Sequence, residues 1–443
     1  MTVDRPVAAP VERVPRGGGG RYEFLDALRG LAALAVVFQH ASERLWPGYF
    51  RFSQAHFGVG QFGVVVFFLV SGFIIPASLE RGRSLGAFWV GRFFRLYPLY
   101  WACLIAAMIL HWVGRYDLKP IFLADPVTNF LTNLTMVQLF IGHPDIQIVL
   151  PAWSLSYELG FYLFLSLLLI GRLNRRSVPL AVLAIALIGP GMFLPPSMVT
   201  GAGANFLTRC AVLVVTVLVA VVFARLAGDR RLGIAAILLV FVTAPLVLNQ
   251  PGPSVLTFVY FATMFVGTVL YRMTSGEITP RQGWAVFGLA LCAIFATSVF
   301  LPPFFDSGSG VWVTWVKQPT TIIPAYLFVA AFLLLRSHSF PRPLLFLGRI
   351  SFSLYLVHWL ILEAMPRWST SVAGIPAAWL TLGTWVICAL VIATVTYRVI
   401  EKPCHELGQR AMAGIDARKR YWNQAKVNGV GVPWRLLQSG DGR

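Results

Sequence analysis

The stretch that decides the fold is "LRGLAALAVVFQH", residues 28–40, an apolar run with Arg29 near one end and His40 at the other. Eleven positions separate the two residues, which is three helical turns plus about 20°, so both side chains share one helix face about 16 Å apart. Asp26 and Glu43 fall on the same stripe, while the opposite face is Leu, Ala, Val and Phe. The pattern predicts a membrane helix with a polar line facing protein and an apolar back facing lipid.

Composition extends this prediction to the whole chain. The 443 residues are 57% hydrophobic and 12% charged, with a mean hydropathy of +0.72, whereas soluble domains carry about 25% charged residues. We therefore predict an all-α, polytopic transmembrane helix bundle with about 10–12 spanning helices. The twelve candidate spans are 25–44, 60–79, 86–112, 152–171, 178–195, 206–226, 232–248, 254–272, 284–301, 320–336, 344–364 and 375–399.

The net charge of +18 is distributed as membrane orientation requires. Most Lys and Arg residues lie in alternate connecting segments, together with both termini, which places these segments in the cytoplasm. We predict a multi-pass protein of the cell inner (plasma) membrane with both termini cytoplasmic, whose partner is the lipid bilayer and not a nucleic acid. Residues 1–20, which end in "RGGGG", read as a disordered cytoplasmic tail, and residues 401–443 as a basic tail resting on the anionic inner leaflet.

Two further motifs carry polar groups, one in the middle of the second predicted span and one at the cytoplasmic start of the third. In "FFLVSGFIIP", residues 67–76, the small residues Ser71 and Gly72 allow close helix packing. The alternative is that the hydroxyl of Ser71 binds a ligand. In "GRFFRLYPLYW", residues 91–101, Arg92 and Arg95 lie on one face. Anchoring of the helix by the positive-inside rule would explain their positive charge but not their pairing. A functional alternative, which explains the pairing, is that the two guanidinium groups clamp phosphate groups of a ligand.

Two later motifs place polar residues at one-turn intervals. In "PAWSLSYELGFYLF", residues 151–164, a stripe runs through Ser154, Glu158 and Tyr162 behind Trp153; in "LGRISFSLYLVHWLI", residues 347–361, a stripe runs through Ser351, Tyr355 and His358. From the direction of each span we expect His40, Glu158 and His358 at similar depth in the outer half. Arg29, Arg92 and Arg95 gather at the cytoplasmic side.

Together these five motifs, in this order, resemble the acyltransferase-3 family of integral membrane acyltransferases over roughly residues 22–400. The resemblance implies a membrane acyltransferase domain over 21–400. It implies an acyl-CoA donor, usually acetyl-CoA, bound from the cytoplasm and faced by Arg29, Arg92 and Arg95. The acceptor it implies is a carbohydrate or similar hydroxyl compound at the outer side, with His40 as the catalytic histidine. The family core is usually described with ten spans.

We therefore interpret the protein as an O-acyltransferase in which His40 takes the proton of the acceptor hydroxyl and Glu158 orients or charges His40. An acyl-His40 intermediate is a second route. Candidate substrate-binding residues are Ser71, Trp153, Tyr355 and His358, and no residue cluster has the spacing of a metal site. The alternative from another class is a proton-coupled transporter or exporter with His40 and Glu158 as a proton relay.

Overall fold

The computed structural model describes residues 22–80, 84–136, 138, 146–193, 254–300, 304–306, 311–313, 316–365 and 370–427. Almost all of this part is helical. In chain order the first half contains α1 (Glu23–Leu45), α2 (Pro47–His56), α3 (Val59–Leu79), α4 (Leu85–Trp112), α5 (Pro120–Ala124), α6 (Pro126–Leu134), the 3₁₀ turn η2 (Leu150–Ala152), α8 (Trp153–Ile170), α9 (Ser177–Ala186) and α10 (Ile188–Gly191).

The second half contains α13 (Ser254–Thr274), α14 (Pro280–Phe300), the strands β1 (Phe304–Asp306) and β2 (Val311–Val313), α15 (Lys317–Leu334), α16 (Arg342–Ala364), α17 (Thr370–Thr396), the π-helical turn η3 (Tyr397–Glu401) and α18 (Lys402–Val427). The two short strands pair antiparallel between α14 and α15. They are a small addition to the helical bundle that the sequence predicts.

Among the described residues, nine helices are long and apolar enough to cross a membrane. The predicted polytopic helical bundle is therefore confirmed. The candidate span 178–195 is shorter than expected, because the described chain forms α9 and α10 with a "GPG" sequence at 189–191. The candidate spans 206–226 and 232–248 lie outside the described residues.

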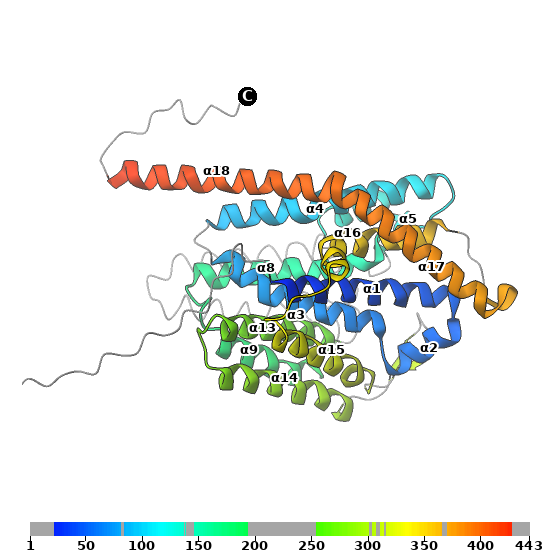
Figure 1. Ribbon diagram of the computed structural model, residues 1–443, viewed down its shortest axis with the longest axis horizontal. Coiled ribbons are helices and arrows are strands. Elements are labelled where there is room, and N and C mark those ends of the chain that lie inside the picture. Colours follow the sequence, from blue (N-terminus) through cyan, green and yellow to red (C-terminus); the bar gives the residue numbers. More distant parts are fainter. Residues whose placement is uncertain are drawn as a thin grey trace, which may run out of the picture.

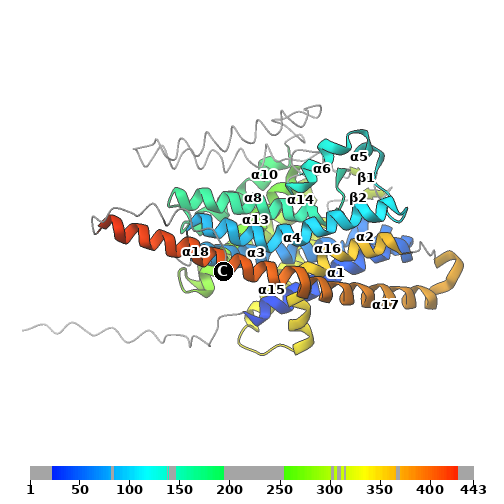
Figure 2. The ribbon, with the colours of Figure 1, turned by 90° about the horizontal axis from the view of Figure 1, so that it is seen from above.

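The long helices lie side by side in layers (Figures 1 and 2). Helix α1 is central and contacts α16 and α3, while α3 contacts α13 and α15, and α13 contacts α9 and α14. On the other side of α1, α18 runs along α4. We call the end of the bundle at which α1, α4 and α16 begin the basal end, and the opposite end the distal end.

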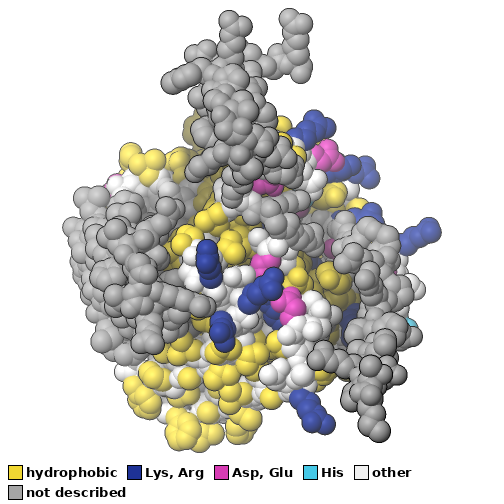
Figure 3. All heavy atoms as spheres, turned by 90° about the vertical axis from the view of Figure 1, so that its left-hand side faces the viewer, with side chains coloured by type: hydrophobic (Ala, Val, Ile, Leu, Met, Phe, Trp, Pro, Cys, Tyr) yellow, Lys and Arg dark blue, Asp and Glu magenta, His cyan; other side chains and the backbone are white. Residues whose placement is uncertain are grey.

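The basal end is the left-hand side of Figure 1, and Figure 3 looks directly onto it. Lys and Arg side chains stand out between apolar ones there, with a few carboxylates among them. This matches the sequence pattern of basic segments between apolar runs.

Helices α1 and α16 run parallel and touch through glycines. A Cβ at Gly30 would lie 2.8 Å from Cβ of Leu347, and a Cβ at Gly348 would overlap the backbone carbonyl of Asp26. Glycine therefore permits an approach that any other residue would prevent. Near the far ends of the same helices Arg44 and Glu363 form an ion pair of 2.6 Å, so the two helices stay in register over most of their length.

A second close contact joins α3 to α13. A Cβ at Gly72 would overlap the carbonyl of Met264, and one at Gly267 would overlap that of Leu69. The hydroxyl of Thr268 donates a hydrogen bond of 3.0 Å to the carbonyl oxygen of Gly72. Close packing is therefore the role that the structure gives to Gly72.

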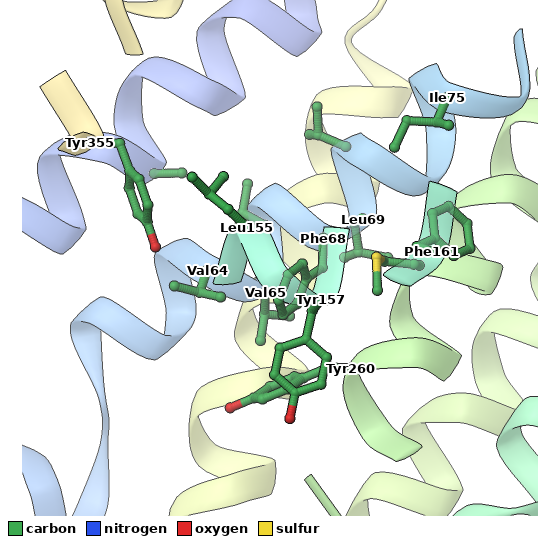
Figure 4. Close-up of a cluster of buried hydrophobic side chains, with 14 of the residues drawn as sticks. Val64, Val65, Phe68, Leu69, Ile75, Leu155, Tyr157, Phe161, Tyr260 and Tyr355 are labelled. Carbon is green, nitrogen blue, oxygen red and sulfur yellow. The ribbon is translucent and has the colours of Figure 1, made fainter. Parts of the chain in front are cut away.

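The apolar core lies between α3, α8 and α13 (Figure 4). In α3, Phe68 packs against Tyr157 of α8 and Tyr260 of α13, at ring-centroid distances of 6.0 and 5.2 Å. Buried aromatic side chains of this kind fix the distances between helices because they fill large volumes with few rotatable bonds. The core holds the helices that carry the polar motifs.

The predicted basic tail begins as a packed helix. The chain continues from α17 through η3 into α18, where a Cβ at Gly408 would lie 2.6 Å from Cβ of Phe94. Asp416 accepts hydrogen bonds from the backbone nitrogen and hydroxyl of Ser84, at 3.0 and 3.1 Å. The first part of this segment thus packs on α4, while residues 1–20 and 428–443 lie outside the described part of the chain.

The α1–α16 contact generates a prediction about stability. Gly348→Ala should lower the free energy of unfolding by about 1–3 kcal/mol, because the new methyl group forces two packed backbones apart. Gly288→Ala is the matched control, since a Cβ at Gly288 of α14 meets nothing within 4 Å. Thermal unfolding of both variants in detergent measures the difference. Equal unfolding temperatures would contradict the close contact.

Candidate functional site

Three arginines meet in a cavity inside the bundle. We call it the arginine chamber, defined by Arg29 of α1, Ser71 of α3, Arg92 and Arg95 of α4, Ser154 and Glu158 of α8, and Tyr355 of α16. Its apolar wall includes Phe67, Phe68, Ile74 and Leu96. The sequence motifs from five separate segments of the chain are thus brought to one place.

Arg92 is held in this chamber by aromatic rings. Its side chain is 8% exposed, and its guanidinium carbon lies 5.2 Å from the ring centroids of both Phe88 and Tyr162. The hydroxyl of Tyr162 donates a hydrogen bond to the carboxylate of Glu158. Cation–π contacts and a nearby carboxylate stabilise a buried guanidinium while leaving N–H donors along its edge available to an anion.

A second cavity, the basal pocket, opens beyond the chamber toward the basal end. It shares Arg29 and Arg95 with the chamber and also contains Tyr22, Asp26, Arg349, Tyr397, Glu401, Lys402 and His405. Four arginine or lysine side chains therefore surround the basal pocket: Arg29, Arg95, Arg349 and Lys402. The first two also line the arginine chamber, so the two cavities adjoin each other. Such a concentration of cations suits a ligand with several negative charges.

Glu401 in this pocket was missed by sequence reasoning. Its carboxylate accepts a hydrogen bond of 2.6 Å from the hydroxyl of Ser353 on α16. The π-helical turn at Tyr397–Glu401 brings this residue onto the bundle, and such turns occur often at functional sites. No sequence signal pointed to Glu401, because hydropathy ends the last span at 399 and assigns the residues beyond it to a tail.

The third cavity, which we call the histidine pocket, lies toward the distal end. Its wall contains His40, Trp153, Tyr355 and Lys317, together with the amide side chains Gln39, Gln54, Gln61 and Gln318 and the hydroxyl of Tyr260. Gln61 donates hydrogen bonds of 3.2 Å to Tyr260 and 2.7 Å to Gln318. Amides and aromatic rings in this arrangement can bind a neutral molecule that carries many hydroxyl groups.

The histidine pocket is separated from the arginine chamber by Tyr355, which lines both. Its hydroxyl donates a hydrogen bond of 2.8 Å to the carbonyl of Pro151 and lies 2.7 Å from the hydroxyl of Ser154. The three cavities therefore follow one another along α1, which supplies Arg29 to the first two and His40 to the third.

His40 lies against two side chains of α16. Its ring centroid is 5.5 Å from that of His358 and 5.1 Å from that of Trp359. His358 is not part of the wall of the histidine pocket, whereas His40 is. The structure thus places His40 at the cavity and His358 behind it, in agreement with the expected similar depth of the two histidines.

Glu158 lies at a different depth from the one expected. It lines the arginine chamber, not the histidine pocket, where the α8 residue is Trp153. The reason is that the segment before α8 is already buried, with Ile148, Val149 and Ala152 fully covered. Helix α8 therefore begins inside the protein, and five residues of helix carry Glu158 about 7 Å further toward the basal end.

Glu158, which the sequence predicts to orient or charge His40, lines the arginine chamber in the structure. Glu158 instead accompanies the arginines, together with Ser71. The candidate substrate-binding residues are divided between cavities: Trp153 faces the histidine pocket, Ser71 faces the chamber, and Tyr355 faces both.

Within the described residues, no group of three His, Cys, Asp or Glu side chains is arranged to hold a metal ion.

Comparison with known proteins defines the class to which this chain belongs. The family model described as "Acyltransferase domain" matches residues 22–211 and 208–398. The chain is therefore a member of the acyltransferase-3 family, as the motifs indicate. No solved structure matches it.

Curated relatives agree with this assignment. The chain is similar to acyltransferase MdmB of Streptomyces mycarofaciens, with 26% identity over 87% of this chain and 92% of that protein. It is also similar to O-acetyltransferase OatA of Staphylococcus aureus, with 23% identity over 89% of this chain. The match spans 59% of the OatA protein, so this chain covers little more than half of that relative. The predicted enzyme class, an O-acyltransferase, is confirmed.

The arginine chamber and basal pocket generate a prediction about anion binding. Inorganic pyrophosphate should raise the unfolding temperature of the purified protein, because a ligand that binds only the folded state stabilises it. Arg92→Gln/Arg95→Gln should abolish most of this shift. The matched control is Arg281→Gln/Arg336→Gln, which removes the same charge from exposed positions. An equal shift in all three proteins would show that the pyrophosphate effect does not involve the chamber.

Proposed function

We propose that the protein moves an acyl group, acetyl in the simplest case, from cytoplasmic acyl-CoA to a hydroxyl of a carbohydrate or glycosylated acceptor on the other side of the plasma membrane. The observation that carries this proposal is the series of three cavities that leads from the basal cations past Tyr355 to His40. The family assignment supports acyl transfer, and the name of OatA supports an oxygen acceptor.

The donor side of the proposal rests on charge and length. The phosphates of acyl-CoA match the cations of the basal pocket, where Arg29, Arg95, Arg349 and Lys402 converge. The arm that carries the thioester is about 15–20 Å long, comparable to the helical rise of about 16 Å between Arg29 and His40. With its nucleotide at the basal end, the donor has the reach to present its thioester at His40. The basic side chains at this end support a cytoplasmic location for it under the positive-inside rule.

The acceptor side rests on the chemistry of the histidine pocket. Hydroxyl groups exchange hydrogen bonds with the amides of Gln61 and Gln318, and a sugar ring packs against aromatic faces such as Trp153. Neutral groups outnumber charges there, and the ammonium of Lys317 is hydrogen-bonded at 2.6 Å to Gln54. The pocket therefore favours a hydroxyl-rich acceptor over a multiply charged one.

In the proposed reaction His40 accepts the proton of the acceptor hydroxyl while the oxygen attacks the thioester carbonyl carbon. The carbon–sulfur bond then breaks, and the CoA thiolate takes the proton back from His40. Ser154 and Tyr355 lie where the arginine chamber meets the histidine pocket, and the hydroxyl of Ser154 is the donor that can turn toward the carbonyl oxygen, because Tyr355 donates to Pro151. A route through acyl-His40 uses the same residues in two steps.

His40→Ala should reduce the rate of acyl transfer by about 10²-fold or more, the size expected for loss of a general base or nucleophile. Membrane insertion and unfolding temperature should be retained, because the side chain borders a cavity. His338→Ala, at an exposed position after α15, is the matched control. Product formation is followed by mass spectrometry, and near-normal turnover in the His40 variant would remove this residue from the chemistry.

The arrangement across the membrane is tested with oriented proteoliposomes. Acyl-CoA is supplied on one face and a glycosylated acceptor on the other, and the acylated product is measured by mass. Product should form only with the donor at the basal face and the acceptor at the distal face, because each ligand fits only one end of the cavity series. Product that requires both ligands on the basal face would contradict transfer across the membrane.

A further inference from the structure

We infer that His358 is the positioning residue of His40, acting as a neutral hydrogen-bond acceptor that fixes which nitrogen of the His40 ring carries the proton. This inference rests on the proposed function of His40 in acyl transfer. It gives the orienting role that sequence reasoning assigned to Glu158 to a side chain on α16.

The protonation of His358 follows from its hydrogen bonding. Its Nδ1 lies 3.0 Å from the carbonyl oxygen of Leu354. A carbonyl oxygen only accepts hydrogen bonds, so Nδ1 must carry the hydrogen, and in the neutral ring Nε2 then holds a lone pair. The side chain is 1% exposed, and its Nε2 is buried with no hydrogen-bond partner among the described residues.

A buried acceptor without a partner is costly, at about 1–3 kcal/mol, and needs an explanation. The nearest ring is that of His40, at a centroid distance of 5.5 Å and an angle of 31° between the planes. Each ring nitrogen lies about 1.15 Å from its centroid, so a nitrogen of His40 turned toward this Nε2 along the line between the centroids would lie about 3.2 Å from it, at the upper end of the hydrogen-bond range. His40 is therefore the natural donor to His358.

The other neighbours limit how the His40 ring can turn. The ring of Trp359 packs edge-to-face against it at 5.1 Å and 76°. Trp359 is itself fixed, since its indole nitrogen donates a hydrogen bond of 3.0 Å to Tyr116, whose hydroxyl donates to the carbonyl of Ile148. Two consecutive residues of α16 thus support His40 from behind while its remaining edge faces the histidine pocket.

The charged groups around this arrangement are engaged elsewhere: Glu43, one turn beyond His40 on α1, is an exposed residue whose carboxylate interacts with Arg44. Arg44 on α1 forms its ion pair with Glu363 on α16, and Lys317 on α15 is hydrogen-bonded to Gln54. Glu158 lines the arginine chamber. A neutral imidazole therefore takes the place that a carboxylate holds in many histidine-based sites.

A hydrogen bond to His358 would affect His40 both in its neutral form, before the reaction, and in its protonated form, after it has accepted the proton of the acceptor hydroxyl. Before reaction, donation of one N–H to His358 leaves the other nitrogen of His40 unprotonated and directed to the acceptor hydroxyl. After it accepts the proton, His40 carries two N–H groups, and the one toward His358 keeps its acceptor. His358 neither gains nor loses a proton, because its Nδ1 keeps its hydrogen and donates it in the hydrogen bond to the Leu354 carbonyl oxygen.

The test compares two amide substitutions of His358, one that replaces the donor at Nδ1 and one that replaces the acceptor at Nε2. His358→Asn keeps a donor near Nδ1 for the Leu354 carbonyl but has nothing at the Nε2 position. His358→Gln places an amide oxygen, an acceptor, near that position. We expect kcat to fall about tenfold or more in the Asn variant with the acceptor KM changed by less than about threefold, and the Gln variant to recover most of the loss.

A second measurement does not depend on acyl transfer. Diethylpyrocarbonate modifies the unprotonated nitrogen of neutral imidazole, and peptide mass spectrometry reports its rate at His40 alone. The rate should fall roughly twofold in the Asn variant, because a proton shared evenly between both nitrogens of His40 leaves the exposed nitrogen unprotonated in about half of the molecules, and return in the Gln variant. His338, which is exposed, serves as the internal reference in each sample.

The outcomes separate this inference from the proposed function. Equal His40 labelling and equal turnover in the wild type and the Asn variant would overturn the positioning role. Equal losses in the Asn and Gln variants, together with a lower unfolding temperature, would show a packing role only and overturn it as well. The expected labelling pattern without acyl transfer by the wild type would support the histidine pair and contradict the proposed reaction.

Discussion

The contact between α1 and α16 is the constraint on which the rest of the site depends. Two helices that are distant in the sequence run parallel and touch at Gly30 and Gly348, so their relative height is fixed at the basal end. Ten residues further along each helix lie His40 and His358, and beyond them Arg44 and Glu363 form an ion pair. Because both helices rise by the same distance per residue, one close glycine contact sets the alignment of all the later pairs.

Buried arginines serve two different purposes in this bundle. Arg272 on α13 is 2% exposed and forms ion pairs with both Glu80 and Glu277, so its charge is compensated and it joins neighbouring helices. Arg92 rests on the rings of Phe88 and Tyr162 and borders a cavity. The first arrangement uses the guanidinium as an internal crosslink, whereas the second keeps a cation at the place where an anion can enter.

Polar groups of different kinds are divided between the cavities, which suits the two chemically different substrates of the proposed reaction. Cations gather at the basal pocket and the arginine chamber, while neutral amides and aromatic side chains line the histidine pocket. Tyr355 marks the boundary, and its hydroxyl is bound to the Pro151 carbonyl beside the start of α8. In the proposed reaction only the acyl group passes this boundary, so neither substrate has to cross the membrane.

The sequence by itself determined the helical membrane bundle, because hydropathy and length define spans without reference to their neighbours. It also determined that Arg29 and His40 share a face, since helical periodicity is local, and the order of five motifs indicated the family. Only the tertiary structure decided that His40 contacts His358, that Glu401 reaches the basal pocket and that Glu158 lies with the arginines. The depth of a side chain depends on where its helix begins. Helix α8 begins behind a buried segment, and that position is set by packing against other helices, not by the residues of the helix itself.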